Sequence, residues 1–198
     1  MTELKKKRIK AVMKYTWPFY ILSALLVVFG LNFLFGITHR LPAYKCLTLF
    51  VSGEMIDAKK LNNDLLEKFK DNELKDFSCI SADPSDGHYY SKLSIPGYNT
   101  ADVLIIPTSK LEGLNVSAFA LYFDSKLTDY YQGNEFFSYN EVNYGVKIDK
   151  TKVSEYFTLP NEDCYMFLNG KSENIGEYTK KQIKEHDNAL RLVKDWGK

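Results

Sequence analysis

The amino-acid sequence predicts an α/β protein in which one N-terminal transmembrane helix precedes a single three-layer domain with a mostly parallel sheet. Residues 15–38 contain no charged side chain, and three short apolar segments follow, with helical patterns between them. Strands this apolar are typical of a parallel sheet that helices cover on both faces. The expected parts are a basic cytoplasmic segment at 1–14, the transmembrane helix at 15–38, a linker at 39–45 and an outer α/β domain at 46–198.

The composition is that of a globular protein, with 45% hydrophobic and 26% charged residues among 198. The formal net charge of +1 conceals an asymmetry. Residues 1–38 hold six of the 26 basic residues and one of the 25 acidic residues, so the rest of the chain carries 20 basic and 24 acidic residues. This mildly acidic body argues against nucleic acid as a partner, because phosphate binding needs a concentrated basic face.

The uncharged run YTWPFYILSALLVVFGLNFLFGIT has 24 residues, and about 20 are needed to cross ~30 Å of hydrocarbon. We expect Pro18 near the start of this helix, where its missing N–H matters little. The basic run KKKRIK precedes the helix, which predicts a single-pass protein of the cell membrane with its N-terminus in the cytoplasm. A cleaved signal peptide is the main alternative, although signal h-regions are shorter, roughly 7–15 residues.

Three cysteines, Cys46, Cys79 and Cys164, follow the apolar run. No CxxC or CxxxH spacing supports a metal or redox site, so we expect no metal and no cofactor. Small buried thiols are the simplest interpretation. A Cys46–Cys79 disulfide between neighbouring strands is the alternative that the sequence leaves open.

The first half of the outer domain reads strand, helix, strand, helix, strand. The elements are expected at 46–51, from Asp57 to about Asn72, at 77–81, at 89–93 and at 101–106. Asp57 suits the N-cap of the first helix. Leu61, Leu65 and Phe69 recur every four residues and give that helix one apolar face. The run IPGYNT is expected to break the second helix.

The second half has a looser pattern. We expect a helical turn at SKLEGL, strands at 143–148 and 164–169, a turn at 169–174, and a helix from about Glu177 to Trp196. Thr179 and Gln182 have capping-box spacing for this last helix. The spacing places His186 and Leu190 on its apolar face, where a core histidine is the simpler interpretation.

Four of these segments together resemble the first lobe of bacterial extracellular solute-binding proteins. They are CLTLFVSGE, DAKKLNNDLLEKFK, FSCISADPSDGHYYSKLS and ADVLIIPTSKLEGL, and FFSYNEVNYGVKI is similar to a later family segment in which a Tyr-Gly pair precedes a strand. The resemblance covers roughly residues 46–150. Family members close two lobes around a ligand, whereas the outer part here has the size of one domain. The resemblance therefore implies a shortened, membrane-anchored relative with a ligand cleft at the strand ends.

Ligands of open α/β sheets bind outside the carboxyl ends of the strands. This rule selects as ligand-binding candidates Ser52, Gly53 and Glu54 after the first strand, Ser81 and Asp83 after the second, and Thr108 and Ser109 after the third. Ser109 is equally placed to N-cap the helical turn that follows.

Aromatic side chains gather between residues 130 and 144. They are Tyr130, Tyr131, Phe136, Phe137, Tyr139 and Tyr144. Such rings can line a sugar or peptide groove, and Tyr144 joins the ligand-binding candidates for this reason. A core position under a loop is the alternative.

We expect a binding or interaction module that recognises a small molecule, a peptide or a membrane protein. Motifs such as G-x-S-x-G, H-E-x-x-H, a P-loop and GxGxxG do not occur in the sequence, so no catalytic residue is predicted. An accessory subunit of a membrane complex is the first alternative. The second is a membrane-tethered envelope enzyme with Glu54, Asp83 or His186 as acid or base.

Overall fold

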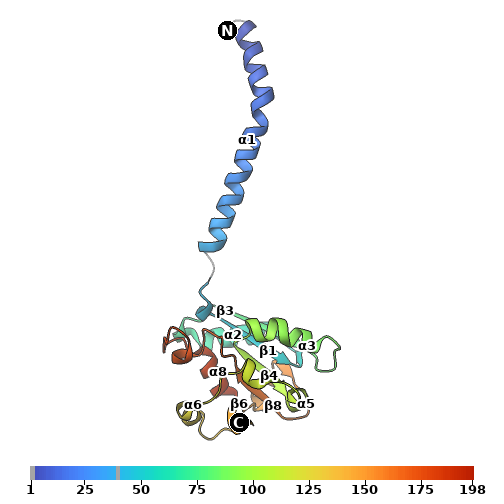
Figure 1. The fold of residues 1–198 in the computed structure, drawn as a ribbon, viewed down its shortest axis with the longest axis vertical. Helices are drawn as coiled ribbons and strands as arrows, with labels where there is room; N and C mark the ends of the chain where they lie inside the picture. The colour runs from blue at the N-terminus through green and yellow to red at the C-terminus, as the bar shows by residue number, and fades with distance from the viewer. Residues whose placement is uncertain (1–2, 39–40) are drawn as a thin grey trace. The chain divides into compact units, whose positions relative to one another are not determined.

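The computed structural model describes residues 3–38 and 41–198, and the chain divides into two compact units, Met1–Leu41 and Pro42–Lys198 (Figure 1). The first unit is one helix, α1 (Glu3–Thr38). Its stretch Lys14–Gly36 is long and apolar enough to cross a membrane, with 23 residues and a mean hydropathy of 2.1. At 1.5 Å per residue this stretch is about 35 Å long, against ~30 Å of hydrocarbon.

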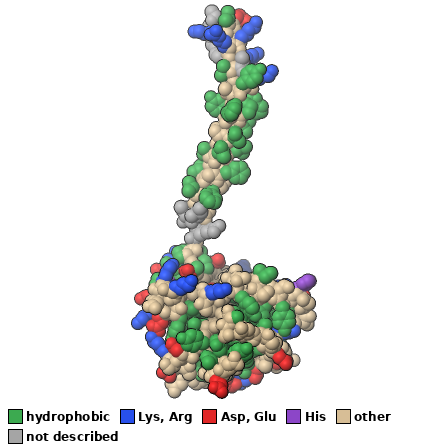
Figure 2. Space-filling view, in the orientation of Figure 1, with side chains coloured by type: hydrophobic (Ala, Val, Ile, Leu, Met, Phe, Trp, Pro, Cys, Tyr) green, Lys and Arg blue, Asp and Glu red, His purple; other side chains and the backbone are tan. Residues whose placement is uncertain are grey.

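Helix α1 begins earlier than the sequence predicts. Residues 4–14 are helical as well, because Lys, Arg, Leu, Ala and Met are good helix formers. Basic side chains gather at the start of the helix, and hydrophobic side chains cover the rest (Figure 2). Pro18 consequently lies inside the helix, so the prediction that it stands near the start is wrong. The first two residues of the predicted linker, 39 and 40, lie outside the described residues.

The second unit contains a six-stranded sheet in the order β3-β1-β4-β8-β6-β5 and a ribbon of β2 and β7. Its strands are β1 (Cys46–Ser52), β2 (Glu54–Met55), β3 (Asp76–Ala82), β4 (Val103–Pro107), β5 (Phe136–Tyr139), β6 (Val142–Lys147), β7 (Phe157–Thr158) and β8 (Cys164–Leu168). Its α-helices are α2 (Ala58–Lys68), α3 (Tyr89–Lys92), α4 (Tyr98–Thr100), α5 (Thr108–Leu111), α6 (Ser125–Tyr130), α7 (Lys150–Val153) and α8 (Asn188–Trp196). Its other helical turns are η1 (Ala43–Lys45), η2 (Lys70–Asn72), η3 (Leu93–Gly97), η4 (Val116–Ala118) and η5 (Gly176–Tyr178).

The sheet is mixed, so the prediction of a mostly parallel sheet is wrong. Strand β1 pairs in parallel with β3 and β4. Strand β8 runs antiparallel to β4, β6 antiparallel to β8, and β5 antiparallel to β6. Strands β5 and β6 form a hairpin whose two turn residues, Asn140 and Glu141, both have positive φ, as in a type I′ turn. A hairpin reverses the chain, whereas a parallel strand needs a crossover connection.

Helices cover both faces of the sheet, so the predicted three layers and α/β class are confirmed. Leu49 and Val51 of β1 belong to a core that includes residues of α2, α6 and α8. Phe50 points to the opposite face, into a second core that includes residues of α3 and α5. Successive side chains of a strand alternate between the two faces, which explains why both sides of β1 and β4 are apolar.

The last helix is shorter than predicted. It begins at Asn188 rather than near Glu177, and residues 179–187 have no regular secondary structure. Gln182 adopts a left-handed conformation with φ of 51°, which a right-handed helix does not allow. Its backbone N–H donates to the Thr179 carbonyl in a turn, so these two residues do not form a capping box.

The second predicted helix does not end at IPGYNT. A π-helical turn, η3, contains Pro96 and leads into α4. The Asn99 and Thr100 side chains donate to the carbonyls of Ile95 and Pro96 and cap the end of this helical segment.

The alternative of a Cys46–Cys79 disulfide is excluded by strand register. Cys46 lies opposite Asp76, whereas Cys79 lies opposite Leu49, three positions further along β1. Three residues of a strand span about 10 Å, beyond the reach of a disulfide. All three cysteines are free. Burial raises the pKa of the Cys79 thiol to about 12, so this side chain stays a neutral thiol.

Candidate functional site

The carboxyl end of β1 is closed rather than open. Ser52 is fully buried, and its hydroxyl lies 2.7 Å from the hydroxyl of Tyr89. Glu54 is exposed, but its backbone pairs with Thr158 in the β2–β7 ribbon. A Cβ on Gly53 would lie 2.5 Å from the Thr158 carbonyl oxygen, so only glycine fits beneath this ribbon.

The carboxyl end of β4 is covered by the loop 159–163. The Thr108 backbone N–H and hydroxyl both donate to the Asp163 carbonyl at 2.9 Å. The Ser109 backbone N–H and hydroxyl donate to the Glu162 carboxylate at 2.6 and 2.5 Å. Ser109 lies inside α5 and is not its N-cap, so that alternative is wrong; the Glu162 side chain accepts the N–H in its place.

The other predicted site residues are scattered. Ser81 and Asp83 are exposed, and the Ser85 N–H that donates to the Asp83 carboxylate lowers the pKa of that carboxyl. Tyr144 is half-buried, with its ring 6.3 Å from that of Tyr139. None of the five cavities that the structure describes is lined by a predicted ligand-binding residue.

The aromatic cluster is divided between the two cores and does not form one groove. Tyr130, Tyr131 and Phe136 pack in the core beneath α8. Phe137, Tyr139 and Tyr144 pack on the opposite face of the sheet. Tyr131 is fully buried and donates its hydroxyl hydrogen to the Leu190 carbonyl at 3.0 Å, so the core alternative is confirmed for this residue.

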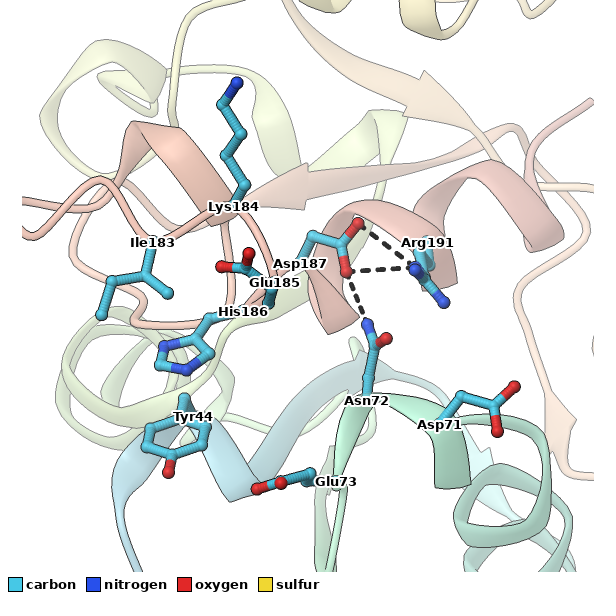
Figure 3. A pocket seen from close by; sticks show the side chains of 10 residues that line it. All are labelled: Tyr44, Asp71, Asn72, Glu73, Ile183, Lys184, Glu185, His186, Asp187 and Arg191. Carbon is cyan, nitrogen blue, oxygen red and sulfur yellow. Dashed lines mark hydrogen bonds and ion pairs between the residues drawn. The ribbon is translucent and has the colours of Figure 1, made fainter.

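A large open space of the second unit lies at the opposite end of β1. The largest described cavity, about 660 Å³, is here called the His186 cleft (Figure 3). It is lined by Tyr44, Asp71, Asn72, Glu73, Ile183, Lys184, Glu185, His186, Asp187 and Arg191. Tyr44 lies in η1, the turn that precedes β1, whereas the predicted site follows the carboxyl end of β1. The seven residues of β1 separate the two regions by roughly 20 Å.

Two contacts organise the His186 cleft. The rings of His186 and Tyr44 stack with their centroids 3.7 Å apart and their planes 4° from parallel. Asp187 accepts from Asn72 Nδ2 at 2.5 Å and pairs with Arg191 Nε at 3.0 Å, which joins the loop to η2 and α8 (Figure 3). His186 is therefore a stacked wall residue of a cleft, not a core residue of a helix.

A second space, here called the lysine cavity, is also lined by His186. It has a volume of about 410 Å³ and is lined by Gly170, Lys171, Ser172, Glu173, Tyr178, Thr179, Lys180, Lys181 and His186. A third cavity, of about 310 Å³, is lined by Lys126, Leu127, Tyr130, Gly176, Glu177, Tyr178, Lys184, Asp187 and Leu190. Residues of the connection 169–187 contribute to all three.

This connection is long for a compact domain, with only the short turn η5 inside it. Gly176 N–H donates to the His186 carbonyl at 2.7 Å and closes residues 176–186 into one loop. Gly176 has φ of 57°, a conformation that suits glycine at the closure. Compact loops with adjacent ends are frequently functional, so we assign the candidate functional site to the connection 169–187.

A buried polar network attaches this connection to the sheet. Asp102 precedes β4 and accepts from Thr48 N at 2.7 Å and from the Ser172 hydroxyl at 2.5 Å. Asn169 Nδ2 donates to the Ala101 carbonyl at 2.7 Å, and Asn174 Nδ2 to the Cys46 carbonyl at 2.8 Å. Burial raises the pKa of the Asp102 carboxyl to about 6, although the hydrogen bonds from Ser172 and Thr48 oppose the shift.

Sequence reasoning missed this site because residues 177–196 were expected to form one helix. The Asn, Gly and Ser residues of NGKSEN predict the start of a loop, but no local signal shows that the loop continues to Asp187. Among the described residues, no group of three or more His, Cys, Asp and Glu side chains could hold a metal ion. No family model and no curated protein matches the chain.

Proposed function

We propose that this chain is a single-pass, membrane-anchored binding module whose second unit lies outside the cytoplasm. The length and apolarity of Lys14–Gly36 support an anchor. The basic residues of 5–10, which directly precede it, support a cytoplasmic N-terminus. The main alternative for this segment is a signal sequence that is removed.

The observation that carries the binding proposal is the convergence of three cavities on the connection 169–187. Concave surfaces of about 300–1,000 Å³ are the usual form of small-molecule sites. The solute-binding resemblance implies a cleft at the carboxyl ends of the strands, but the β2–β7 ribbon and the loop 159–163 fill that region. We therefore place the binding surface at the amino end of β1.

The geometry disfavours the enzyme alternative with Glu54, Asp83 and His186 as a set. Glu54 follows the carboxyl end of β1, whereas His186 stacks on Tyr44 before its amino end. Groups separated by roughly 20 Å cannot act on one reacting atom, because acid–base catalysis needs hydrogen-bond reach. An accessory role in a membrane complex remains the second proposal, supported by the same predicted anchor.

Cysteine labelling tests the location. Gln182→Cys introduces an exposed thiol into the connection, and Lys5→Cys introduces one near the start of α1. A membrane-impermeant maleimide is expected to label the Gln182→Cys protein in intact cells and the Lys5→Cys protein only after lysis, each compared with the parent chain. The reverse pattern would refute the orientation, and release of the domain into the medium would indicate a cleaved signal.

Thermal unfolding of the full chain in nanodiscs tests the binding surface. The panel contains sugars, short peptides and phosphorylated small molecules, and a ligand of the folded state raises the unfolding temperature by mass action. We expect Lys181→Ala to reduce the increase and Thr108→Ala to preserve it. If Thr108→Ala reduces the increase and Lys181→Ala preserves it, the ligand binds at the strand ends instead. If no compound of the panel raises the unfolding temperature, the result counts against a binding module.

A further inference from the structure

The lysine cavity carries an unbalanced charge. Three ammonium groups, from Lys171, Lys180 and Lys181, line it, against the single carboxylate of Glu173. Elsewhere in residues 41–198 many lysines have acidic partners, such as Lys45 with Glu73 and Lys60 with Glu155, whereas the structure records no ion pair for the three lysines of the cavity. They are exposed and available to a ligand.

Backbone donors accompany these ammonium groups. The structure records no acceptor within residues 41–198 for the backbone N–H of Lys180 or of Lys181, which lie in the turn 179–182. Lys171 differs, since its N–H donates to Asn169 Oδ1 at 3.0 Å. The 180–181 side of the cavity thus has cationic side chains and exposed main-chain N–H groups without an acceptor in the described part of the second unit, a combination that anions bind.

The frame of the cavity is fixed independently of any ligand. Ser172 donates to Asp102 at 2.5 Å and accepts from Asn174 N at 2.9 Å, so its hydroxyl hydrogen is already donated within the protein. The Thr179 hydroxyl, also in the wall of the cavity, donates to the Gly176 carbonyl at 2.9 Å. Both hydroxyl hydrogens are therefore donated to protein acceptors, and the lysines remain as the donors for a ligand.

We propose that the lysine cavity binds the phosphate group of a small phosphorylated molecule, with Lys171, Lys180 and Lys181 as its cationic contacts. This inference rests on the proposed binding function and names its ligand class. A volume of about 410 Å³ exceeds that of phosphate alone, so the remainder of the ligand packs along Tyr178. The Glu173 carboxylate accepts from a hydroxyl group of the ligand, which favours a phosphorylated polyol.

The neighbouring His186 cleft opposes an extended polyanion. Asp71, Glu73, Glu185 and Asp187 line it, against Lys184 and Arg191. A nucleic acid strand that followed the surface from the lysine cavity would meet these carboxylates and be repelled. The site therefore suits one compact phosphate group, carried either by a free metabolite or by a lipid headgroup.

Calorimetric titration of the full chain in phosphatidylcholine nanodiscs tests the proposal, with inorganic phosphate and glycerol phosphate as probes. Lys180→Ala/Lys181→Ala is expected to weaken phosphate binding by about tenfold or more, because the double variant loses two charge-assisted hydrogen bonds to the phosphate group. The matched control Lys59→Ala/Lys70→Ala removes two exposed lysines outside the cavity and is expected to leave the affinity unchanged. Lys180→Arg/Lys181→Arg retains both charges and is expected to preserve binding.

Lysine acetylation of the parent chain, read by mass spectrometry, gives a second measurement that needs no substitution. Phosphate is expected to protect Lys171, Lys180 and Lys181 and to leave Lys59 and Lys70 reactive. Nanodiscs that contain phosphatidylglycerol distinguish the two sources. Weaker binding of added glycerol phosphate there means that a headgroup competes for the cavity, whereas equal binding means a free metabolite.

Absence of phosphate binding, or binding that the cavity substitutions leave unchanged, would overturn the inference. A sugar or peptide that stabilises the chain through the connection 169–187 would in that case leave the proposed function standing and refute only the ligand class. Failure of every compound in the panel would instead refute the binding function itself.

Discussion

Replacing Asp102 by asparagine removes a carboxylate that lies almost entirely out of water, with 8% of its surface exposed, between β1 and the connection 169–187. The carbonyl oxygen of asparagine can still accept from Thr48 N, and its amide can donate to the Ser172 hydroxyl oxygen, whose own hydrogen then loses its acceptor. That lost bond does not depend on pH, so the pH dependence of the comparison reports the ionisable group alone.

The magnitude follows from the pKa of the Asp102 carboxyl, which burial raises from 3.8 to about 6. Below pH ~3 the carboxyl is protonated in both the folded and the unfolded state, so it does not change the free energy of unfolding. As the pH rises, the unfolded chain releases the proton first, so the folded state loses about 3 kcal/mol by pH ~7. Asp102→Asn has no such loss, and its stability relative to the parent chain should increase by about 3 kcal/mol over this range.

Urea unfolding at a series of pH values measures this difference. Trp196 is 3% exposed and reports unfolding by its fluorescence, and a Trp17→Phe background removes the other tryptophan. Asp76→Asn, at an exposed carboxylate of β3, controls for the loss of one negative charge. If the free energies of unfolding of Asp102→Asn and its parent differ by the same amount at every pH from ~4 to ~7, the reasoning from burial is refuted.

Two further substitutions test the packing of the second unit. Tyr131→Phe removes the buried hydroxyl that donates to the Leu190 carbonyl, and urea unfolding should show a loss of about 1–2 kcal/mol; no change would mean that water replaces the bond. Gly145→Ala would place a Cβ 2.9 Å from the Phe167 ring, and a loss of about 1–3 kcal/mol is expected in the same assay, whereas the control Gly87→Ala enters open space; equal effects would contradict the close packing.

The sequence predicts those elements whose signals are local. The apolar strand 101–106 and the helix that Asp57 caps are confirmed, with Asp57 Oδ1 accepting from Lys60 N at 2.8 Å. The direction of β8 has no local signal, because an apolar strand pairs equally well with a parallel or an antiparallel neighbour. The helix-like spacing around His186 is misleading for a related reason: the left-handed turn at Gln182 is set by its surroundings rather than by its residue type.

The strand-end rule depends on the chain that follows each strand, which a local pattern does not show. Thr108 and Ser109 stand where a parallel sheet would hold a ligand, yet Glu162 and Asp163, more than fifty residues later, occupy their donors. Lys150 supports this loop by donating to the carbonyls of Pro160 and Glu162. The local sequence around a strand end does not predict long-range contacts of this kind.

The cost of burying Asp102 supports the assignment of the site to the connection 169–187. A carboxylate that lowers stability near neutral pH is a poor choice for a purely structural link. Here the carboxylate fixes Ser172 in the wall of the lysine cavity and also joins β1 through Thr48. Because buried, strained or costly groups concentrate where a surface must keep one arrangement, the network fits a preorganised binding wall better than an ordinary loop.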